Sequence, residues 1–349
     1  MKGNRRKRLR TVTFFLILIS TVALFRGSPA IAAGSASSIW GADYFPNIPL
    51  ITHTGEKVRF FDDLIKDKVV AINFIFTRCP DACPLETARL REVQKILGDR
   101  VGKDVFMYSI TIDPEYDTQE VMKEYAEKFE AGPGWLFLTG NKDDIVLLRK
   151  KLGLYNVEEE GGNLTAHTLS LIIGNQKTGH WRKGSPFENP YVLATQIGSW
   201  LHNWKMPPKK KRDYSEAPEL RSISKGESLF RTRCAACHTI GDKDEVRMGK
   251  KPIGPDLLGV TEKRDRTWLI RIIAEPDKLF EEQDPLALAL LAEYGNLKMP
   301  NMRLNEIETM SLITYLEEES ARLEQVKASD QQPRDQKLGG KHTSHKEHK

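Results

Sequence analysis

The chain has 349 residues, 40% of them apolar and 29% charged, which is ordinary for a soluble globular protein and suggests two domains. This composition argues against wholesale disorder, a collagen-like repeat and a membrane protein with several spans. The first 33 residues contain seven Lys and Arg and no acidic residue, so they account for the formal net charge of +5 and leave −2 for the remainder. Without a basic surface to neutralise phosphates, we expect no nucleic-acid partner.

Residues 1–33 predict export from the cytoplasm. Lysines and arginines precede an apolar run over 11–25, and the small-residue pattern Ala30-Ile31-Ala32 follows it. This order is typical of a secretory signal peptide. An uncleaved membrane anchor is the alternative, although a helix over that run spans only about 22 Å of a hydrocarbon core of roughly 30 Å. Either reading places the rest of the chain in the bacterial periplasm or on the outer face of the cytoplasmic membrane, with membrane association through the N-terminus if the leader is retained.

Residues 43–204 predict an α/β domain, because strand-like and helix-like segments alternate along them. The continuous apolar run VVAINFIF is typical of a strand buried on both faces. In chain order we expect a strand at 69–76, a helix at 84–97, a strand at 105–112, a helix from Asp117, a strand at 135–138, a helix at 141–152, a hairpin of 169–173 and 180–183, and a helix at 189–204. This order is that of a thioredoxin-like fold.

An all-α domain is expected after a linker. Residues 205–222 predict the linker, since they are charged, contain prolines and lack an apolar period. From 223 to 323 the pattern is helical throughout, and it opens with a capping box of Ser224 and Glu227. Further helices are expected at 265–274, 285–294 and 305–323. The tail over 324–349 is polar and is predicted to be disordered.

The sequence CAACH at 234–238 is the pattern that attaches haem c covalently. Its cysteines, Cys234 and Cys237, can bind the two vinyl groups of a haem, and His238 can supply an imidazole to one face of the iron. An incidental disulfide between the two cysteines is the alternative. We therefore predict a covalent haem c in the second domain, which implies a redox partner for that haem.

A methionine is the natural second axial ligand, because no histidine lies between residues 239 and 341. Met299 lies immediately before the last predicted helix, and Met302 is close enough to compete. Met248 lies in a loop rich in Gly and Lys. Any single methionine is more often a packing residue than a ligand.

Together with FRTRCAACHTIG, the segments GPDL at 254–257 and KMPNMRL at 298–304 give residues 222–322 a specific resemblance to the class I cytochromes c. The resemblance implies that His238 is the proximal ligand of the haem iron and Met299 the distal one, with Met302 the next candidate. It also implies that the first and last helices cross at Gly226, Phe230 and Tyr315. Ligation by His and Met raises the iron potential, which suits electron transfer.

Cys79 and Cys83 form a C-x-x-x-C pair between a predicted buried strand and the N-terminus of a helix. A helix N-terminus favours the thiolate and lowers its pKa, so we expect a reactive pair. Two thiolates and one imidazole suit copper, and a disulfide between the two cysteines is also compatible with the spacing. His167 is the best candidate imidazole, because it follows a loop rich in Gly and Asn and opens an apolar strand. The alternative for a lone histidine is a hydrogen-bonded loop residue.

Four segments in order, FTRCPDACP at 76–84, TIDPEYDT at 111–118, WLFLTG at 135–140 and the pair His167-Thr168, closely resemble the Sco/SenC family. The resemblance implies a thioredoxin fold and copper bound by three residues, Cys79, Cys83 and His167. It also implies a role in building the binuclear copper centre of cytochrome c oxidase, whose copper-receiving subunit is the expected partner.

Two positions depart from the family. Arg78 precedes the first cysteine where relatives often have His, and Ala166 precedes the histidine where relatives often have Asp. A missing carboxylate weakens the control of the imidazole, and the positive charge of Arg78 favours thiolates but disfavours a bound cation.

Several functions remain open from the sequence. The first is a copper metallochaperone and electron carrier, which would not be an enzyme. The second is a thiol–disulfide oxidoreductase that cycles Cys79 and Cys83. The third is an electron carrier whose first domain only docks it, and peroxidase chemistry is a weaker fourth. A haem moves one electron, as copper does, whereas a disulfide needs two. Dithiol–disulfide couples of redox proteins lie from about −270 to −120 mV, and a His/Met haem is expected to lie higher. We therefore expect the haem to exchange electrons with copper or to accept them from the dithiol.

Overall fold

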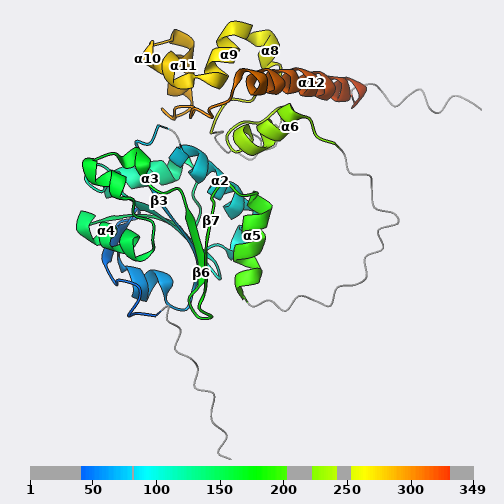
Figure 1. Ribbon diagram of the computed structural model, residues 1–349. Helices are drawn as coiled ribbons and strands as arrows, with labels where there is room; N and C mark the ends of the chain where they lie inside the picture. The colour runs from blue at the N-terminus through cyan, green and yellow to red at the C-terminus, as the bar shows by residue number, and fades with distance from the viewer. Residues whose placement is uncertain (1–40, 81, 203–221, 242–252, 331–349) are drawn as a thin grey trace, which may run out of the picture. The chain divides into compact units, whose positions relative to one another are not determined.

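The computed structural model describes residues 41–80, 82–202, 222–241 and 253–330 (Figure 1). The predicted leader, nearly all of the predicted linker, Met248 and the tail beyond residue 330 lie outside these ranges. Within the part of the chain that is described, no helix combines the length and the apolar composition that crossing a membrane requires.

The first domain is built on a seven-stranded mixed sheet in the order β2-β1-β5-β4-β3-β6-β7. Strands β3, β4 and β5 are parallel, whereas β6 runs antiparallel to β3 and forms a hairpin with β7. This arrangement confirms the predicted thioredoxin-like α/β fold. The strands are β1 Pro49–Thr52, β2 Lys57–Arg59, β3 Val69–Ile75, β4 Phe106–Thr111, β5 Trp135–Gly140, β6 Leu171–Asn175 and β7 His180–Gly184.

Helices cover both faces of this sheet (Figure 1). They are α2 Ala82–Leu97, α3 Gln119–Lys128, α4 Lys142–Lys151 and α5 Pro190–Gly198. Every residue of β3 is buried, as the continuous apolar run predicted, because the strand is central and has helices above and below it. The strand ends at the loop that carries Cys79, and α2 begins just before Cys83. The core of the sheet therefore holds both cysteines in place.

Some element predictions were wrong in detail. The strands β1 and β2 and a π-helical turn at Phe60–Ile65 were missed, because strands of three or four residues carry too little apolar pattern. Helix α3 begins after Thr118, whose hydroxyl accepts a hydrogen bond from Val121 N, and not at Asp117. Strand β6 begins at Leu171, two positions later than predicted.

The second domain is all-α, as predicted. Its elements are α6 Lys225–Leu229, a π-helical turn Phe230–Cys234, α8 Val260–Lys263, α9 Arg266–Ala274, α10 Pro276–Glu281, α11 Pro285–Glu293 and α12 Glu306–Asp330. Ser224 caps α6 by accepting from Glu227 N at 3.1 Å. Helix α12 continues to Asp330, so the prediction of a disordered tail from residue 324 was wrong for its first residues. The segment EQVKASD contains neither Gly nor Pro, so nothing in it breaks the helix.

The first and last helices of this domain cross at a glycine. A Cβ atom at Gly226 would lie 2.0 Å from the carbonyl oxygen of Ser311 on α12, so only glycine allows this approach. The rings of Phe230 and Tyr315 pack beside the crossing with centroids 5.7 Å apart. These are the residues that the cytochrome resemblance places at the helix crossing.

We expect Gly226→Ala to destabilise the second domain by about 1–3 kcal/mol, because the added methyl group must push α6 and α12 apart. Thermal unfolding of the haem-loaded protein, followed by haem absorbance, measures this domain alone. Ser228→Ala on the same helix is the control, since it changes helix propensity without adding an atom at the crossing. Equal unfolding temperatures for both variants would show that the crossing tolerates a side chain.

Candidate metal centres

The first centre draws its side chains from two separate parts of the chain. Cys79 lies in the loop between β3 and α2, where its backbone N–H donates to Phe76 O at 3.1 Å. Cys83 lies in the first turn of α2, and His167 follows a short 3-10 turn, Leu164–Ala166, ahead of β6. All three are buried, with 8%, 0% and 6% of their surfaces exposed. Because β3 and β6 are neighbouring strands, the sheet brings the histidine to the cysteine loop.

The side chains of this centre form neighbouring pairs. The Cys83 sulfur lies 3.7 Å from His167 Nε2, and the thiols of Cys79 and Cys83 are hydrogen-bonded. With metal–sulfur and metal–nitrogen bonds of about 2.3 and 2.0 Å, two ligands at a tetrahedral angle lie about 3.5 Å apart. The Cys83–His167 pair therefore already has a spacing suited to one metal ion. Among the described residues, no three His, Cys, Asp or Glu side chains are gathered closely enough to hold an ion together, so binding through all three residues requires them to draw closer.

His167 presents a free lone pair to the cysteine. Its Nδ1 lies 2.9 Å from the carbonyl oxygen of Leu164. Because a carbonyl oxygen only accepts, Nδ1 carries the proton and Nε2, which faces Cys83, does not. Burial lowers the pKa of His167, so the ring is neutral near pH 7. The backbone carbonyl of Leu164 thus orients the imidazole. A carboxylate at position 166 could have had this role, but this chain has Ala166 there.

The thiol of Cys83 departs from the sequence-based expectation. A helix N-terminus was expected to lower its pKa, but the pKa of Cys83 is raised well above its usual value. The hydrogen bond with Cys79 is the main cause and burial the second, and a negative charge on Cys79 acts in the same direction. Cys83 therefore keeps its proton near pH 7, and binding a metal must release it.

Arg78, beside Cys79, is directed to a second loop. Its guanidinium donates to Asp113 Oδ2 at 2.5 Å and lies over the ring of Tyr116 at 4.1 Å. The hydrogen bond to Asp113 raises the pKa of the guanidinium. Since Asp113 compensates this charge, its repulsion of a cation at Cys79 is smaller than the sequence alone suggested.

A buried carboxyl group that the sequence analysis missed lies one turn of α2 beyond Cys83. Glu86 is fully buried; its Oε1 accepts from Asn73 Nδ2 at 2.9 Å, and its Oε2 has no hydrogen-bond partner among the described atoms. A chain of hydrogen bonds continues from Asn73 to Ser109 and on to the indole N–H of Trp135. Burial raises the pKa of Glu86 to about 8. The sequence signal that could have revealed this residue is a glutamate among the apolar residues on the buried face of a predicted helix.

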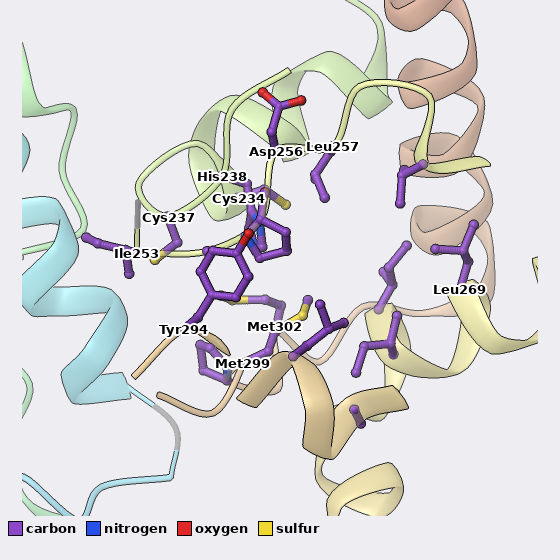
Figure 2. A pocket seen from close by; sticks show the side chains of 18 of the residues that line it. Cys234, Cys237, His238, Ile253, Asp256, Leu257, Leu269, Tyr294, Met299 and Met302 are labelled. Carbon is purple, nitrogen blue, oxygen red and sulfur yellow. The ribbon is translucent and has the colours of Figure 1, made fainter. Parts of the chain in front are cut away.

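The second centre gathers the predicted haem residues around an apolar pocket (Figure 2). Cys234, Cys237 and His238 line it together with both candidate methionines, Met299 and Met302. Figure 2 shows the two methionine side chains on the part of the pocket opposite His238. The structure thus brings both candidates to the pocket, and the choice between them stays a prediction.

The surroundings of His238 fit a haem ligand. Its Nδ1 donates to Pro255 O at 2.9 Å, which leaves Nε2 without a proton. Burial lowers the pKa of His238, which favours the neutral ring that binds iron. A Cβ atom at Gly254 would lie 2.8 Å from His238 Cε1, so the glycine makes room for the ring. Two thiols, a fixed neutral imidazole and a thioether around an apolar pocket are the donors that a covalent haem needs.

Comparisons with known proteins identify relatives of both domains. Residues 42–202 match the family model described as SCO1/SenC, and residues 223–320 match the one described as Cytochrome c. The chain is 39% identical over 106 residues to Protein sco1 of Schizosaccharomyces pombe, covering 30% of this chain and 39% of that protein. It is 30% identical over 131 residues to a protein of Stutzerimonas stutzeri named "Putative copper-binding protein", covering 37% of this chain and 62% of that protein. It therefore spans less than two thirds of either relative.

Among solved structures, the chain is similar to a cytochrome c domain from Pseudomonas putida. The identity is 50% and the TM-score 0.27, and the match covers 31% of this chain and 99% of that chain.

Proposed function

Because the chain joins a SCO1/SenC domain at 42–202 to a cytochrome c domain at 223–320, we propose that it is an exported copper carrier for the assembly of a cytochrome c oxidase. Copper is its cargo, bound by Cys79, Cys83 and His167. The copper-receiving subunit of the oxidase is the partner, and the periplasm or the outer face of the cytoplasmic membrane is the place of action.

One observation carries the copper proposal. The unprotonated Nε2 of His167 lies 3.7 Å from the Cys83 sulfur, and Cys79 is hydrogen-bonded to that same sulfur. Two sulfur donors and one nitrogen donor form a soft set that suits copper. The name of the Stutzerimonas stutzeri relative supports the same cargo.

We propose that the second domain holds a covalent haem c through Cys234 and Cys237, with His238 and Met299 as axial ligands. The haem supplies one-electron transfer when bound. Dithiol–disulfide couples of redox proteins lie from about −270 to −120 mV, and His/Met ligation raises the potential of a haem iron. Electrons should therefore pass from the dithiol to this domain, or between it and bound copper. A haem potential below that of the Cys79–Cys83 couple would contradict this direction.

A thiol–disulfide oxidoreductase is the alternative function. The observation that favours it is the hydrogen bond between the thiols of Cys79 and Cys83, because this contact brings the sulfurs together for disulfide formation. Under this alternative the pair reduces the cysteines of a target protein, and copper plays no part.

An anaerobic copper titration of the haem-loaded protein lacking residues 1–33 separates the two functions. We expect one tightly bound copper per chain, followed by thiolate-to-copper absorbance. His167→Ala and Cys83→Ser should each weaken binding by more than about 100-fold, since loss of a ligand exceeds the 10–100-fold effect of losing a ligand's hydrogen-bond partner. His180→Ala is the control, because that histidine is exposed on β7.

The outcome decides between the functions. Stoichiometric copper that is lost in both ligand variants supports the carrier. No tight copper, together with a reversible disulfide between Cys79 and Cys83, supports the oxidoreductase instead.

A further inference from the structure

The loop that carries Cys79 is attached to the neighbouring loop by a buried carboxylate. Asp117 has no exposed surface. One of its oxygens accepts the backbone N–H of Thr77 at 3.1 Å and the hydroxyl of Thr111 at 2.5 Å. The other accepts the hydroxyl of Thr77. Thr77 is the second residue before Cys79, so these bonds hold the chain just as it leaves β3.

Asp117 is itself held firmly by its own loop. Its backbone N–H donates to Asp113 O at 2.8 Å. Before Asp117 in the chain, Thr111 is the last residue of β4 and pairs with Ile75 of the parallel strand β3. After Asp117, Thr118 caps the N-terminus of α3. The carboxylate is therefore fixed to the sheet and to a helix. Hydrogen bonds to a buried carboxylate are among the stronger ones, because the charge has no competing water.

The Asp117 carboxylate holds the loop of Cys79 and, among the residues that the structure describes, makes no comparable attachment near Cys83. Cys83 is held by α2, whereas Cys79 precedes that helix and lies between β3 and its first turn. Strand β3 ends at Ile75, so the position of Cys79 depends on what holds residues 76–78. Thr77 contributes both its backbone and its side chain to this attachment.

We propose that Asp117 is a positioning residue, which holds the Cys79 loop so that the Cys79 thiol stays next to Cys83. The inference rests on the proposed function of the Cys79, Cys83 and His167 centre, but it concerns the placement of a thiol and applies whether the centre binds copper or forms a disulfide. Arg78 adds a second, exposed attachment of the same loop to Asp113.

The first test measures the rate at which iodoacetamide alkylates Cys79 in the haem-loaded full-length protein, with the modified peptide identified by mass. Cys79 is 8% exposed. We expect Asp117→Asn and Thr77→Val to raise this rate about tenfold, as expected when a buried hydrogen bond is lost. Thr77→Ser should restore a rate near that of the wild type, because it keeps the hydroxyl donor.

Thr118→Ala is the matched control. It removes the cap of α3 next to Asp117 and so loosens the same loop without touching Thr77. The proposal predicts that this variant leaves the alkylation rate of Cys79 unchanged. An equal increase in Thr118→Ala would mean that general loosening exposes the thiol, and the proposal would be wrong. If Asp117→Asn does not fold, Thr77→Val and Thr77→Ser carry the test alone.

A copper titration of the same variants separates this inference from the proposed function. If the wild type binds copper, Asp117→Asn and Thr77→Val should weaken binding about tenfold while Thr77→Ser does not. If the wild type binds none, the copper carrier is wrong, yet the alkylation rates still decide whether Asp117 positions Cys79. An unchanged Cys79 rate in Asp117→Asn and Thr77→Val overturns the inference in either case.

Discussion

Replacing Glu86 by Gln is expected to remove the loss of stability that the ionisation of Glu86 causes in the first domain between about pH 5 and pH 8. The pKa of Glu86 is raised by burial from 4.5 to about 8 in the folded protein. Between these values the folded state binds more protons than the unfolded state, so stability falls as pH rises and levels off above the folded pKa. The ionised group costs on the order of 5 kcal/mol, since each pKa unit corresponds to 1.36 kcal/mol.

Gln mimics the protonated carboxyl group. Its carbonyl oxygen can still accept from Asn73, and its amide occupies the place of Oε2, which has no described partner in the wild type either. Glu86→Gln should therefore unfold like the wild type near pH 5.5 and be more stable than it near pH 8.5. Calorimetry at both pH values measures the difference, with the transition of the second domain assigned from haem absorbance. Glu115→Gln, whose wild-type side chain is 73% exposed, serves as the control and should show no such gain. The same pH slope in both variants would mean that Glu86 does not titrate in this range.

Met299→Ala is expected to lower the midpoint potential of the haem and to abolish the sulfur-to-iron absorption band of the oxidised protein. A thioether ligand raises the iron potential, and axial ligands together set haem potentials over a range of about 0.8 V. Losing it should shift the potential by a few tenths of a volt. A redox titration followed by haem absorbance measures the shift.

Met302→Ala is the informative comparison, because Met302 lines the same pocket three positions away. Its backbone oxygen accepts from the guanidinium of Arg233 at 3.2 Å, a contact that does not depend on the side chain. We expect Met302→Ala to retain the absorption band and to have a midpoint potential close to that of the wild type. The opposite pattern would assign the distal position to Met302.

Much of the fold was predictable because its signals are local. The apolar run of β3 and the capping residue Ser224 mark elements through the residues that form them. The short strands β1 and β2 could not be predicted from the sequence, because they are stabilised by their partners in the sheet. The extension of α12 to Asp330 was missed because a polar helix and a polar tail share a composition.

The candidate ligands were predictable where chemistry depends on close spacing. The chemistry of CAACH and of the Cys79–Cys83 pair can be inferred from a few consecutive residues. His167 was connected to the pair by its place at the start of an apolar strand and by resemblance to a family. The pairing of β6 with β3 explains why that distant histidine reaches Cys83. The direction of the pKa of Cys83 was wrongly predicted, since a helix N-terminus is visible in a sequence and burial is not.

The two domains and the residue types at each centre could thus be predicted from the sequence, because these features depend on periodicity and on short spacing along the chain. Which atoms come into contact depends on how the chain folds in three dimensions. The fold brings His167 Nε2 to 3.7 Å from the Cys83 sulfur, joins the buried Glu86 to Asn73 and joins the buried Asp117 to Thr77. Each of these contacts joins residues from separate loops, strands or helices. Hydrogen bonding and desolvation act between neighbours in space, so no reading of one segment could reveal them.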